Sequence, residues 1–170
     1  YPTPRWCTAL LLKHWWQPVK GETVLDPSCG EGAILDLYRE RGCRTVGLEL
    51  DAQRAAVARE RGHQVEQVDA LREPWPDAFL LVGNPPYSLA QPFVQKAAAW
   101  ARKKRGRHAA MLMRLSFLEP ADGRGDLFRA FPPDVLILPR RPSFDGKGSD
   151  NVTSAWLCWP QTEGVRWLPP

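Results

Sequence analysis

The amino-acid sequence predicts an α/β fold built on a doubly wound, mostly parallel sheet that ends in an antiparallel hairpin. Three observations support this prediction. Short apolar runs of strand length alternate with helical patterns of about ten residues, the order typical of parallel βαβ units. Glycine or proline follows most of these segments, as expected where a chain turns. After Pro120 the alternation stops, and two apolar runs follow without a helical pattern between them.

The first half of the chain alternates helix and strand. Helical patterns, each followed by a glycine or a proline, are predicted over residues 8–16, 33–41 and 52–62. Apolar strands are predicted over residues 22–26, 44–50 and 63–70. This order predicts that the first strands are parallel and that helices cover the sheet.

The second half begins with the same alternation and then changes. A strand over residues 78–84, a helix over residues 91–104 and a strand over residues 107–118 continue the pattern. A loop rich in glycine, arginine and aspartate then leads to two closing antiparallel strands over residues 134–139 and 152–160. Repeats, low-complexity tracts and linkers are not visible, so we expect a single domain over residues 1–170.

Composition and charge narrow the class of protein. The chain is 44% hydrophobic and 25% charged, typical of an ordinary soluble globular protein. Its net charge of +4 and pI near 9.0 fit a polyanionic partner such as a nucleic acid. The densest basic run, residues 102–107, is either part of that contact or a solvated helix end.

Cysteine spacing and hydropathy indicate the compartment. The four cysteines contain no C-x-x-C pair, which argues against a zinc site or a disulfide framework and favours a reducing, cytoplasmic compartment. No segment reaches the roughly 18 consecutive apolar residues of a membrane span. We therefore expect no metal and no membrane contact.

Polar side chains stand at the predicted carboxyl ends of four successive strands. They are Asp26, Glu49, Asp69 and Asn84. Open α/β sheets bind ligands at this edge, and the Gly-x-Gly turn after Asp26 lets a ligand approach the backbone. A carboxylate at the end of the second strand suits ribose hydroxyls, and Asp69 suits an adenine amine. The absence of a G-x-x-x-x-G-K-[ST] loop argues against an NTPase.

The motifs "DPSCGEG", "GLELD", "VDA" and "NPPY" occur in an order and spacing that resembles the S-adenosylmethionine-dependent amino-methyltransferases. The closer resemblance is to the N6-adenine DNA methyltransferases, and with weaker motifs it covers about residues 2–159. It implies a Rossmann-like, seven-stranded methyltransferase sheet with S-adenosylmethionine as the cofactor. It also implies duplex DNA as the partner, with the target adenine flipped out of the helix.

The resemblance gives "NPPY" a chemical role. An exocyclic aromatic amine is a poor nucleophile because its lone pair is delocalised into the ring. The side-chain oxygen of Asn84 and the carbonyl of Pro85 would accept hydrogen bonds from the two N–H groups of this amine and so favour its pyramidal geometry. Pro86 would help to hold the Pro85 carbonyl in place. Tyr87 would stack on the flipped base, and Phe144 is the candidate for a second aromatic contact.

The resemblance also implies the cofactor contacts. Asp26 would contact the methionine amino group, and Thr3 and Pro4 would approach the methionine carboxylate. The predicted cofactor set is Thr3, Pro4, Asp26, Ser28, Gly30, Gly32, Glu49, Leu50, Asp69, Ala70 and Asn84. Arg140 and Arg141 are predicted substrate contacts to phosphate, together with Arg124 and residues 102–107. We expect Arg114 in an ion pair at the edge of the core, and we assign no function to the three histidines.

The specificity of the enzyme is left open by the sequence. Relatives of this arrangement usually carry a target-recognition region beyond the last hairpin, and none is visible here. Either the enzyme needs little sequence context, or a partner supplies it, or the chain is a fragment. We favour the first account, with a monomer or weak dimer encoded by a bacterium, phage or prophage.

Two other functions fit the same motifs. The first is amine methylation on RNA bases or on a protein glutamine side chain. The second is cofactor or DNA binding without catalysis, against which the intact residues 84–87 argue, because a protein that only binds does not need the acceptor pair.

Overall fold

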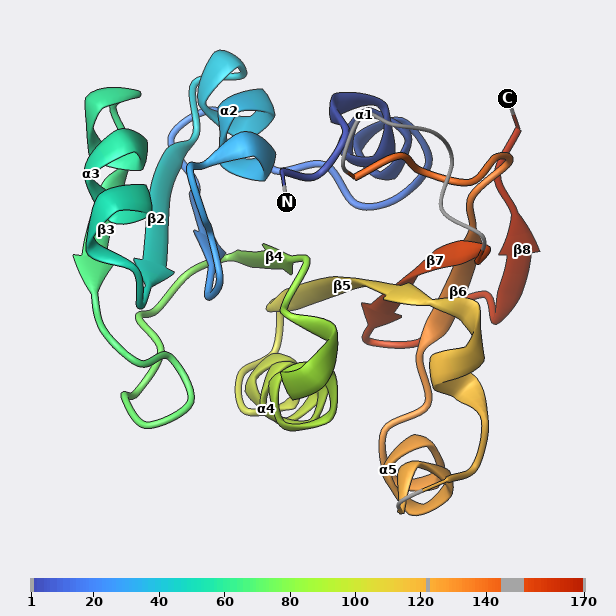
Figure 1. Cartoon of the computed structure of the whole chain (residues 1–170). Coiled ribbons are helices and arrows are strands. Elements are labelled where there is room, and N and C mark those ends of the chain that lie inside the picture. The colour runs from blue at the N-terminus through green and yellow to red at the C-terminus, as the bar shows by residue number, and fades with distance from the viewer. Residues whose placement is uncertain (1, 122, 145–151, 170) are drawn as a thin grey trace.

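The computed structural model describes residues 2–121, 123–144 and 152–169, and the account below concerns these residues. They contain one eight-stranded sheet in the order β3-β2-β1-β4-β5-β7-β6-β8, which Figure 1 shows from β3 at one edge to β8 at the other. The strands are β1 (Thr23–Asp26), β2 (Arg44–Glu49), β3 (Gln64–Gln67), β4 (Leu80–Gly83), β5 (His108–Arg114), β6 (Asp134–Ile137), β7 (Ser154–Trp159) and β8 (Val165–Trp167).

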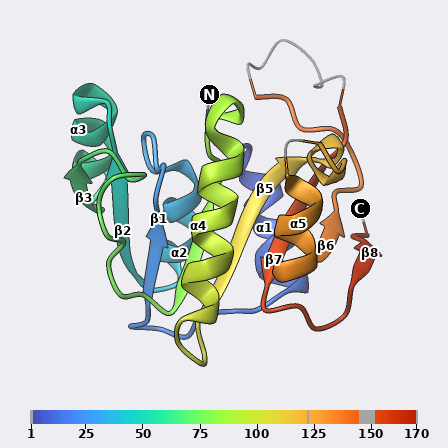
Figure 2. The ribbon, with the colours of Figure 1, turned by 90° about the horizontal axis from the view of Figure 1, so that it is seen from below.

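The sheet is mostly parallel. Strands β1 to β5 pair in parallel, and β7 is antiparallel to both of its neighbours, β5 and β6. The predicted fold class is therefore confirmed, except that the sheet has eight strands instead of seven. Strand β1 lies between β2 and β4, so the chain changes direction across the sheet at β1. Figure 2 shows β1 and β2 side by side on one side of α4.

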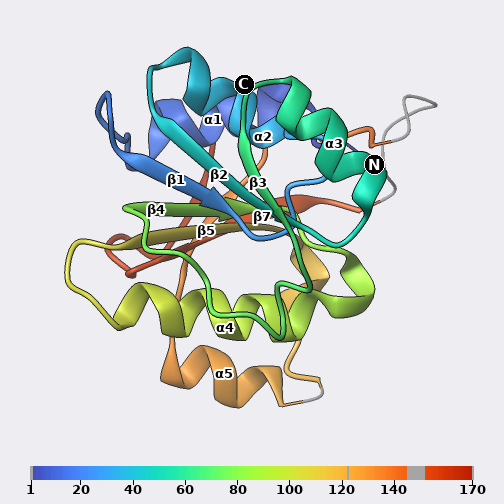
Figure 3. The same cartoon turned by 90° about the vertical axis from the view of Figure 1, so that its left-hand side faces the viewer.

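Helices cover both faces of the sheet. They are α1 (Arg5–His14), α2 (Ala33–Glu40), α3 (Ala52–Glu60), α4 (Ala90–Arg102) and α5 (Arg124–Ala130), with short 3-10 turns at Tyr87–Leu89 and Leu115–Leu118. Figure 3 shows α1, α2 and α3 on one face and α4 and α5 on the other. None of these helices is long and apolar enough to cross a membrane.

Alternation along the strands divides the core between the two faces. Val24 and Leu80 belong to the apolar cluster beneath α1 and α2, whereas their neighbours Leu25 and Leu81 belong to the cluster beneath α4. All four are fully buried. Successive side chains of a strand point to opposite faces, so strands covered on both faces read as continuous apolar runs. This is why the strands were visible in the sequence.

The predicted loop after Pro120 contains a helix, which corrects the sequence prediction. Helix α5 begins after Gly123, which has a φ of +78°, and it buries Leu127. Phe128 packs edge-on against Phe117 with ring centroids 6.0 Å apart. A seven-residue helix is too short to be stable alone, so these contacts with the rest of the chain stabilise it.

Strand β8 was not predicted either. Two of its three residues, Val165 and Trp167, are about 70% exposed, so they show no buried apolar pattern. The turn before β8 is held by the buried Asp134, whose carboxylate accepts backbone N–H bonds from Thr162, Glu163 and Gly164. This long-range contact leaves no local sequence signal.

The basic run over residues 102–107 lies at the end of the sheet opposite the carboxyl ends of β1 and β4. It leads into β5, and the seven-residue β5 spans about 20 Å. Lys104 and Arg107 both pair with Asp77, at 3.0 and 2.7 Å. The run is therefore distant from Asn84, which follows β4 at its other end.

We predict that Asp134→Asn lowers the free energy of unfolding at pH 7 by about 2–3 kcal/mol, because the amide group repels one or more of the three N–H donors. Burial raises the pKa of Asp134, but these hydrogen bonds outweigh it and the net pKa is lowered. The contribution is therefore present above the unfolded pKa and is lost as pH falls through the folded pKa. Urea unfolding at pH 7 and pH 3 measures both effects.

The control is Asp126→Asn, which removes an exposed carboxylate paired with Arg129 on the same helix. A loss of stability as large as that of Asp134→Asn would contradict the assignment.

Candidate active site

A cleft of about 1170 Å³ opens at the carboxyl ends of β1, β2, β3 and β4. The predicted site residues that line it are Thr3, Asp26, Ser28, Gly30, Glu49, Leu50, Asp69, Ala70, Asn84, Pro85, Pro86, Tyr87 and Phe144. Pro4, Gly32, Arg140 and Arg141 are not part of its lining. The structure thus brings four strand ends and segments from both halves of the chain to one place, as expected at a topological switch point.

The glycine loop, residues 27–32, connects β1 to α2. The Cys29 N–H donates to the Leu48 carbonyl at 3.1 Å, and the Gly30 N–H donates to the Glu49 carboxylate at 2.8 Å. Gly30 has a φ of +53°, and a Cβ there would meet no atom within 4 Å. The loop is therefore fastened to the end of β2 and leaves open space at Gly30, beside the cleft.

Glu49 has two roles in this arrangement. One carboxylate oxygen accepts from Gly30, and the other accepts from the Asp51 N–H at 2.9 Å. A carboxylate offers about four acceptor positions, so both oxygens can accept further bonds. Glu49 lines the cleft and can therefore position the loop and bind hydroxyl groups at the same time.

Asp26 is a buried acid at the end of β1, with 1% of its surface exposed. Burial raises the pKa of Asp26 to about 7, and the negative charge of Glu49 adds to this, while the N–H of Ser28, 3.0 Å away, opposes it. A cation in the cleft would favour the ionised form. Asp26 is therefore suited to bind an ammonium group.

The loop after β3 presents Asp69 and Ala70 to the cleft, and Lys96 holds it in place. The ammonium group of Lys96, on α4, donates to the carbonyls of Ala70 and Glu73 at 2.7 and 2.6 Å. The indole N–H of Trp75 also donates to the Ala70 carbonyl, at 2.7 Å. Sequence reasoning missed Lys96, because a single lysine on a helix gives no sign of partners more than twenty residues away.

Asn84 is oriented by the N-terminal segment. Its amide nitrogen donates to the Thr3 hydroxyl at 3.0 Å, and Thr3 is buried. Within the described residues no donor bonds to the Asn84 side-chain oxygen or to the Pro85 carbonyl, whereas the Pro86 carbonyl accepts from Leu89 at 2.9 Å. Two acceptors at the end of β4 are thus left for a ligand.

Three side chains lie beside this acceptor pair. The rings of Tyr87 and Phe144 meet edge to face with centroids 6.4 Å apart. The guanidinium of Arg114 lies 4.2 Å from the centre of the Tyr87 ring. Arg114 also lines the cleft. The ion pair that we expected for it at the core edge stays a prediction, in addition to this contact with Tyr87. Arg114 ends β5 beside β4, which explains its position.

The predicted phosphate contacts lie outside the main cleft. Arg140 stacks on Trp6 at 4.6 Å, and both residues line a smaller cleft together with Arg141 and Ser143. Phe144, which follows Ser143, lines the main cleft. Arg140 and Arg141 are therefore close in sequence to the site without forming its wall.

Comparison with known proteins gives two partial sequence matches. A family model described as "Methionine biosynthesis protein MetW" matches residues 11–76, which include the glycine loop and Glu49 and end before Asn84. The curated protein Ribosomal RNA small subunit methyltransferase A of Thermotoga petrophila is 27% identical over 89 residues. That alignment covers 49% of this chain, and the chain spans only 34% of the relative's length.

Solved structures match nearly the whole chain. A modification subunit of a putative type I restriction enzyme from Vibrio vulnificus has a TM-score of 0.67 and 17% identity, over 93% of this chain and 44% of that one. A putative class I S-adenosylmethionine-dependent methyltransferase from Listeria monocytogenes has a TM-score of 0.68 and 14% identity, over 98% and 65%. The chain therefore has the Rossmann-like methyltransferase fold.

We predict that Asp26→Asn stabilises the protein increasingly as pH rises. The pKa of Asp26 is raised to about 7 in the folded chain, so its contribution is present below the unfolded pKa and is lost as pH rises through about 7. Asparagine keeps the acceptor for Ser28 and does not ionise. Relative to wild type, the variant should gain about 2–3 kcal/mol between pH 5 and pH 8 in denaturant unfolding, most of it below pH 7.

The matched control for this experiment is Asp51→Asn, which removes an exposed carboxylate that caps α3. It should show no such gain with pH. A pH-independent difference for Asp26→Asn would contradict the assignment of a raised pKa.

Proposed function

We propose that this protein transfers a methyl group from S-adenosylmethionine to the exocyclic N6 amine of adenine in DNA, with short or relaxed sequence context. The observation that carries the proposal is the pair of acceptors at Asn84 and Pro85. Asn84 and Pro85 line the same cleft as the acids Asp26, Glu49 and Asp69. This arrangement suits a nucleophilic amine on one side and a nucleoside-like cofactor on the other.

The residues present fit S-adenosylmethionine, the cofactor that the comparisons support. Asp26 would bind the amino group, and Glu49 would bind the ribose hydroxyls, since both line the cleft. Asp69 and the apolar side chains of Leu71 and Phe93 suit an adenine ring, because they combine an acceptor with an apolar wall. The open space at Gly30 admits a ligand close to the backbone.

When bound, S-adenosylmethionine would supply an electrophilic methyl group: the amine nitrogen would form the new N–C bond, the electron pair of the broken S–C bond would stay on sulfur, and the extra proton would leave to water. The chain's own contribution is positioning. The Asn84 side-chain oxygen and the Pro85 carbonyl would accept hydrogen bonds from the two N–H groups of the amine and stabilise the positive charge that develops on nitrogen. Tyr87 offers an aromatic surface to the base, and Phe144 supports that ring from its edge.

DNA is favoured by the likeness to a restriction-modification subunit and by the "NPPY" resemblance. RNA is the second candidate substrate, because the curated relative is named a ribosomal RNA methyltransferase. A glutamine side chain is the third, since its amide nitrogen needs the same pair of acceptors. Basic residues beside the cleft, Arg140 and Arg141, favour a nucleic acid over a peptide.

The first prediction from this proposal is that label from methyl-labelled S-adenosylmethionine appears in N6-methyladenine of DNA. Duplex DNA, single-stranded DNA, RNA and a peptide release factor are offered in parallel, and labelled products are hydrolysed and identified. Asn84→Ala should lower the rate by about 10²–10³, because one acceptor for the developing charge is removed. Gln95→Ala, an exposed amide on α4, is the control and should keep the wild-type rate.

Label in RNA or in the peptide would retain the cofactor site and reject DNA as the substrate. Transfer that is unaffected by Asn84→Ala would reject the assigned acceptor. Cofactor binding without transfer to any of the four substrates would favour a protein that only binds.

The second prediction is that Thr3 acts through Asn84. Thr3→Val should lower kcat about tenfold by removing one hydrogen bond, and leave the affinity for S-adenosylhomocysteine unchanged. Thr3→Ser should restore kcat. If Thr3 instead binds the methionine carboxylate, as the sequence predicted, Thr3→Val will weaken that affinity, which isothermal titration calorimetry measures directly.

A further inference from the structure

We propose that His63 is a positioning residue for the glycine loop: its imidazole, held between Asp36 and Thr45, supports the loop in the conformation that binds the cofactor. The inference rests on the proposed function, because it takes the cleft to be the cofactor site. His63 stands between α3 and β3 and does not line the cleft itself.

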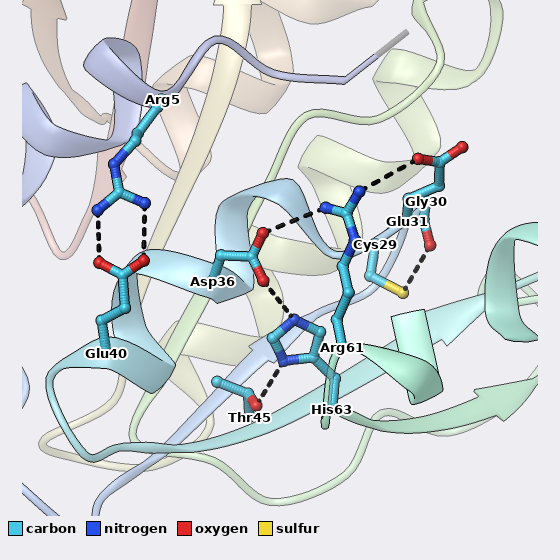
Figure 4. A network of polar contacts seen from close by, with 9 residues as sticks. All are labelled: Arg5, Cys29, Gly30, Glu31, Asp36, Glu40, Thr45, Arg61 and His63. Carbon is cyan, nitrogen blue, oxygen red and sulfur yellow. Dashed lines mark hydrogen bonds and ion pairs between the residues drawn. The ribbon is translucent and has the colours of Figure 1, made fainter. Parts of the chain in front are cut away.

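Both ring nitrogens of His63 are bound inside the protein, as Figure 4 shows. Nδ1 lies 2.8 Å from the Thr45 hydroxyl, and Nε2 lies 3.0 Å from an Asp36 carboxylate oxygen. The His63 side chain is fully buried, whereas Asp36 is about one-third exposed. The ring therefore joins β2 to α2 through a buried polar contact.

The partners define the protonation of the ring. An ionised carboxylate only accepts, so the proton of a neutral ring lies on Nε2 and the Thr45 hydroxyl donates to Nδ1. Burial lowers the pKa of His63, and the positive charges of Arg39 and Arg61 lower it further. The hydrogen bond and the negative charge of Asp36 act in the opposite direction but do not outweigh burial. The ring is thus neutral at pH 7, and all its polar atoms are satisfied.

The ring also lies directly against the glycine loop. A Cβ built on Gly32 would come within 2.5 Å of His63 Cδ2 and 2.7 Å of Nε2, closer than real Cβ contacts. Gly32 has a φ of +88° and directly precedes α2. The absence of a side chain at Gly32 therefore serves the packing of His63 beneath the loop and not a contact with the cleft, which Gly32 does not line.

Two ion pairs of Arg61 connect the glycine loop to α2 at the surface. Arg61 bridges the Asp36 carboxylate at 3.2 Å and the Glu31 carboxylate at 3.5 Å (Figure 4). Glu31 belongs to the glycine loop, and Asp36 lies in the first turns of α2. Arg61 is 42% exposed, so solvent screens these pairs and they contribute little. The buried His63 contact carries most of the effect.

The contacts of His63 are connected to the cleft through the backbone of the glycine loop and the first turn of α2. Asp36 donates its backbone N–H to the Gly32 carbonyl at 3.0 Å, and Ala33 and Ile34, between them, line the cleft. Removing the ring would free Asp36 and leave a void under Gly32. The glycine loop and the first turn of α2 would then no longer be preorganised for binding. The affinity for the cofactor would fall, because binding would have to order them.

The test compares binding of S-adenosylhomocysteine with thermal stability. We expect His63→Ala to weaken binding at least tenfold by calorimetry. His63→Gln should stay within about threefold of wild type, because glutamine places an N–H donor the same number of bonds from Cβ as His Nε2. Glu40→Gln removes the ion pair with Arg5 at the other end of α2 and should leave binding unchanged.

Gly32→Ala tests the same contact from the loop side, and it remains informative if His63→Ala does not fold. Its affinity should fall in the wild-type background because of both the positive φ and the clash with the ring. In the Gly32→Ala/His63→Gln pair the clash is eased by a flexible side chain, so part of the loss should be recovered. Hydrogen exchange of residues 29–36 should rise in each weakened variant.

A lower melting temperature of His63→Ala with affinity within twofold of wild type would show a merely structural role and overturn the inference. So would a loss in Gly32→Ala that His63→Gln does not relieve. If the wild-type protein itself does not bind S-adenosylhomocysteine, the proposed function fails instead, and the two results are distinguishable.

Discussion

The pairing of β1 with β2 on one side and β4 on the other brings Asp26, Glu49 and Asn84 to one cleft. The chain builds β1, β2 and β3 outward in one direction and then returns to add β4 on the other side of β1. The connections after β1 and β4 leave in opposite directions, so a crevice remains between them. Asp26 and Glu49 reach this crevice from one side and Asn84 from the other. The register of β1 with both neighbours therefore places groups that are far apart in sequence.

Asp26 lies at a position in the crevice where burial destabilises its ionised form. Asp26 is buried in contact with the Ser28 N–H, and it lacks a basic partner among the described residues. A carboxylate in such a position is less stable than one in water, which is why its pKa rises to about 7. An incoming ammonium group would remove this cost. The buried carboxylate of Asp26 therefore lowers the stability of the free protein and favours the binding of a cation. Such a loss of stability is common where function determines the residue type.

Much of this could be predicted from the sequence because the signals are local. Apolar runs predicted the strands of the two-sided core, and glycines or prolines predicted their ends. The acids at the strand ends were visible because parallel strands end at one edge. The "NPPY" segment was visible because two prolines at the end of an apolar run are rare in a strand.

What could not be predicted depends on partners distant in the chain. Helix α5 forms because Leu127 and Phe128 pack on the body of the protein, and β8 forms next to a turn that Asp134 holds. His63 looks unremarkable in sequence, and only its burial between α2 and β2 gives it partners. Lys96 and Arg114 likewise acquire their contacts from the folded arrangement.

The end of β4 shows how local and distant constraints combine in one site. The two prolines restrict the backbone of the tetrapeptide by themselves, since each fixes its own φ. They do not orient the Asn84 side chain or the Tyr87 ring. Those contacts come from Thr3, which is 81 residues away in sequence, and from Phe144, near the other end of the chain. The backbone acceptor at Pro85 is thus set by its own sequence, whereas the side-chain acceptor and the aromatic surface exist only once the N-terminal segment and the segment after β6 lie against the sheet.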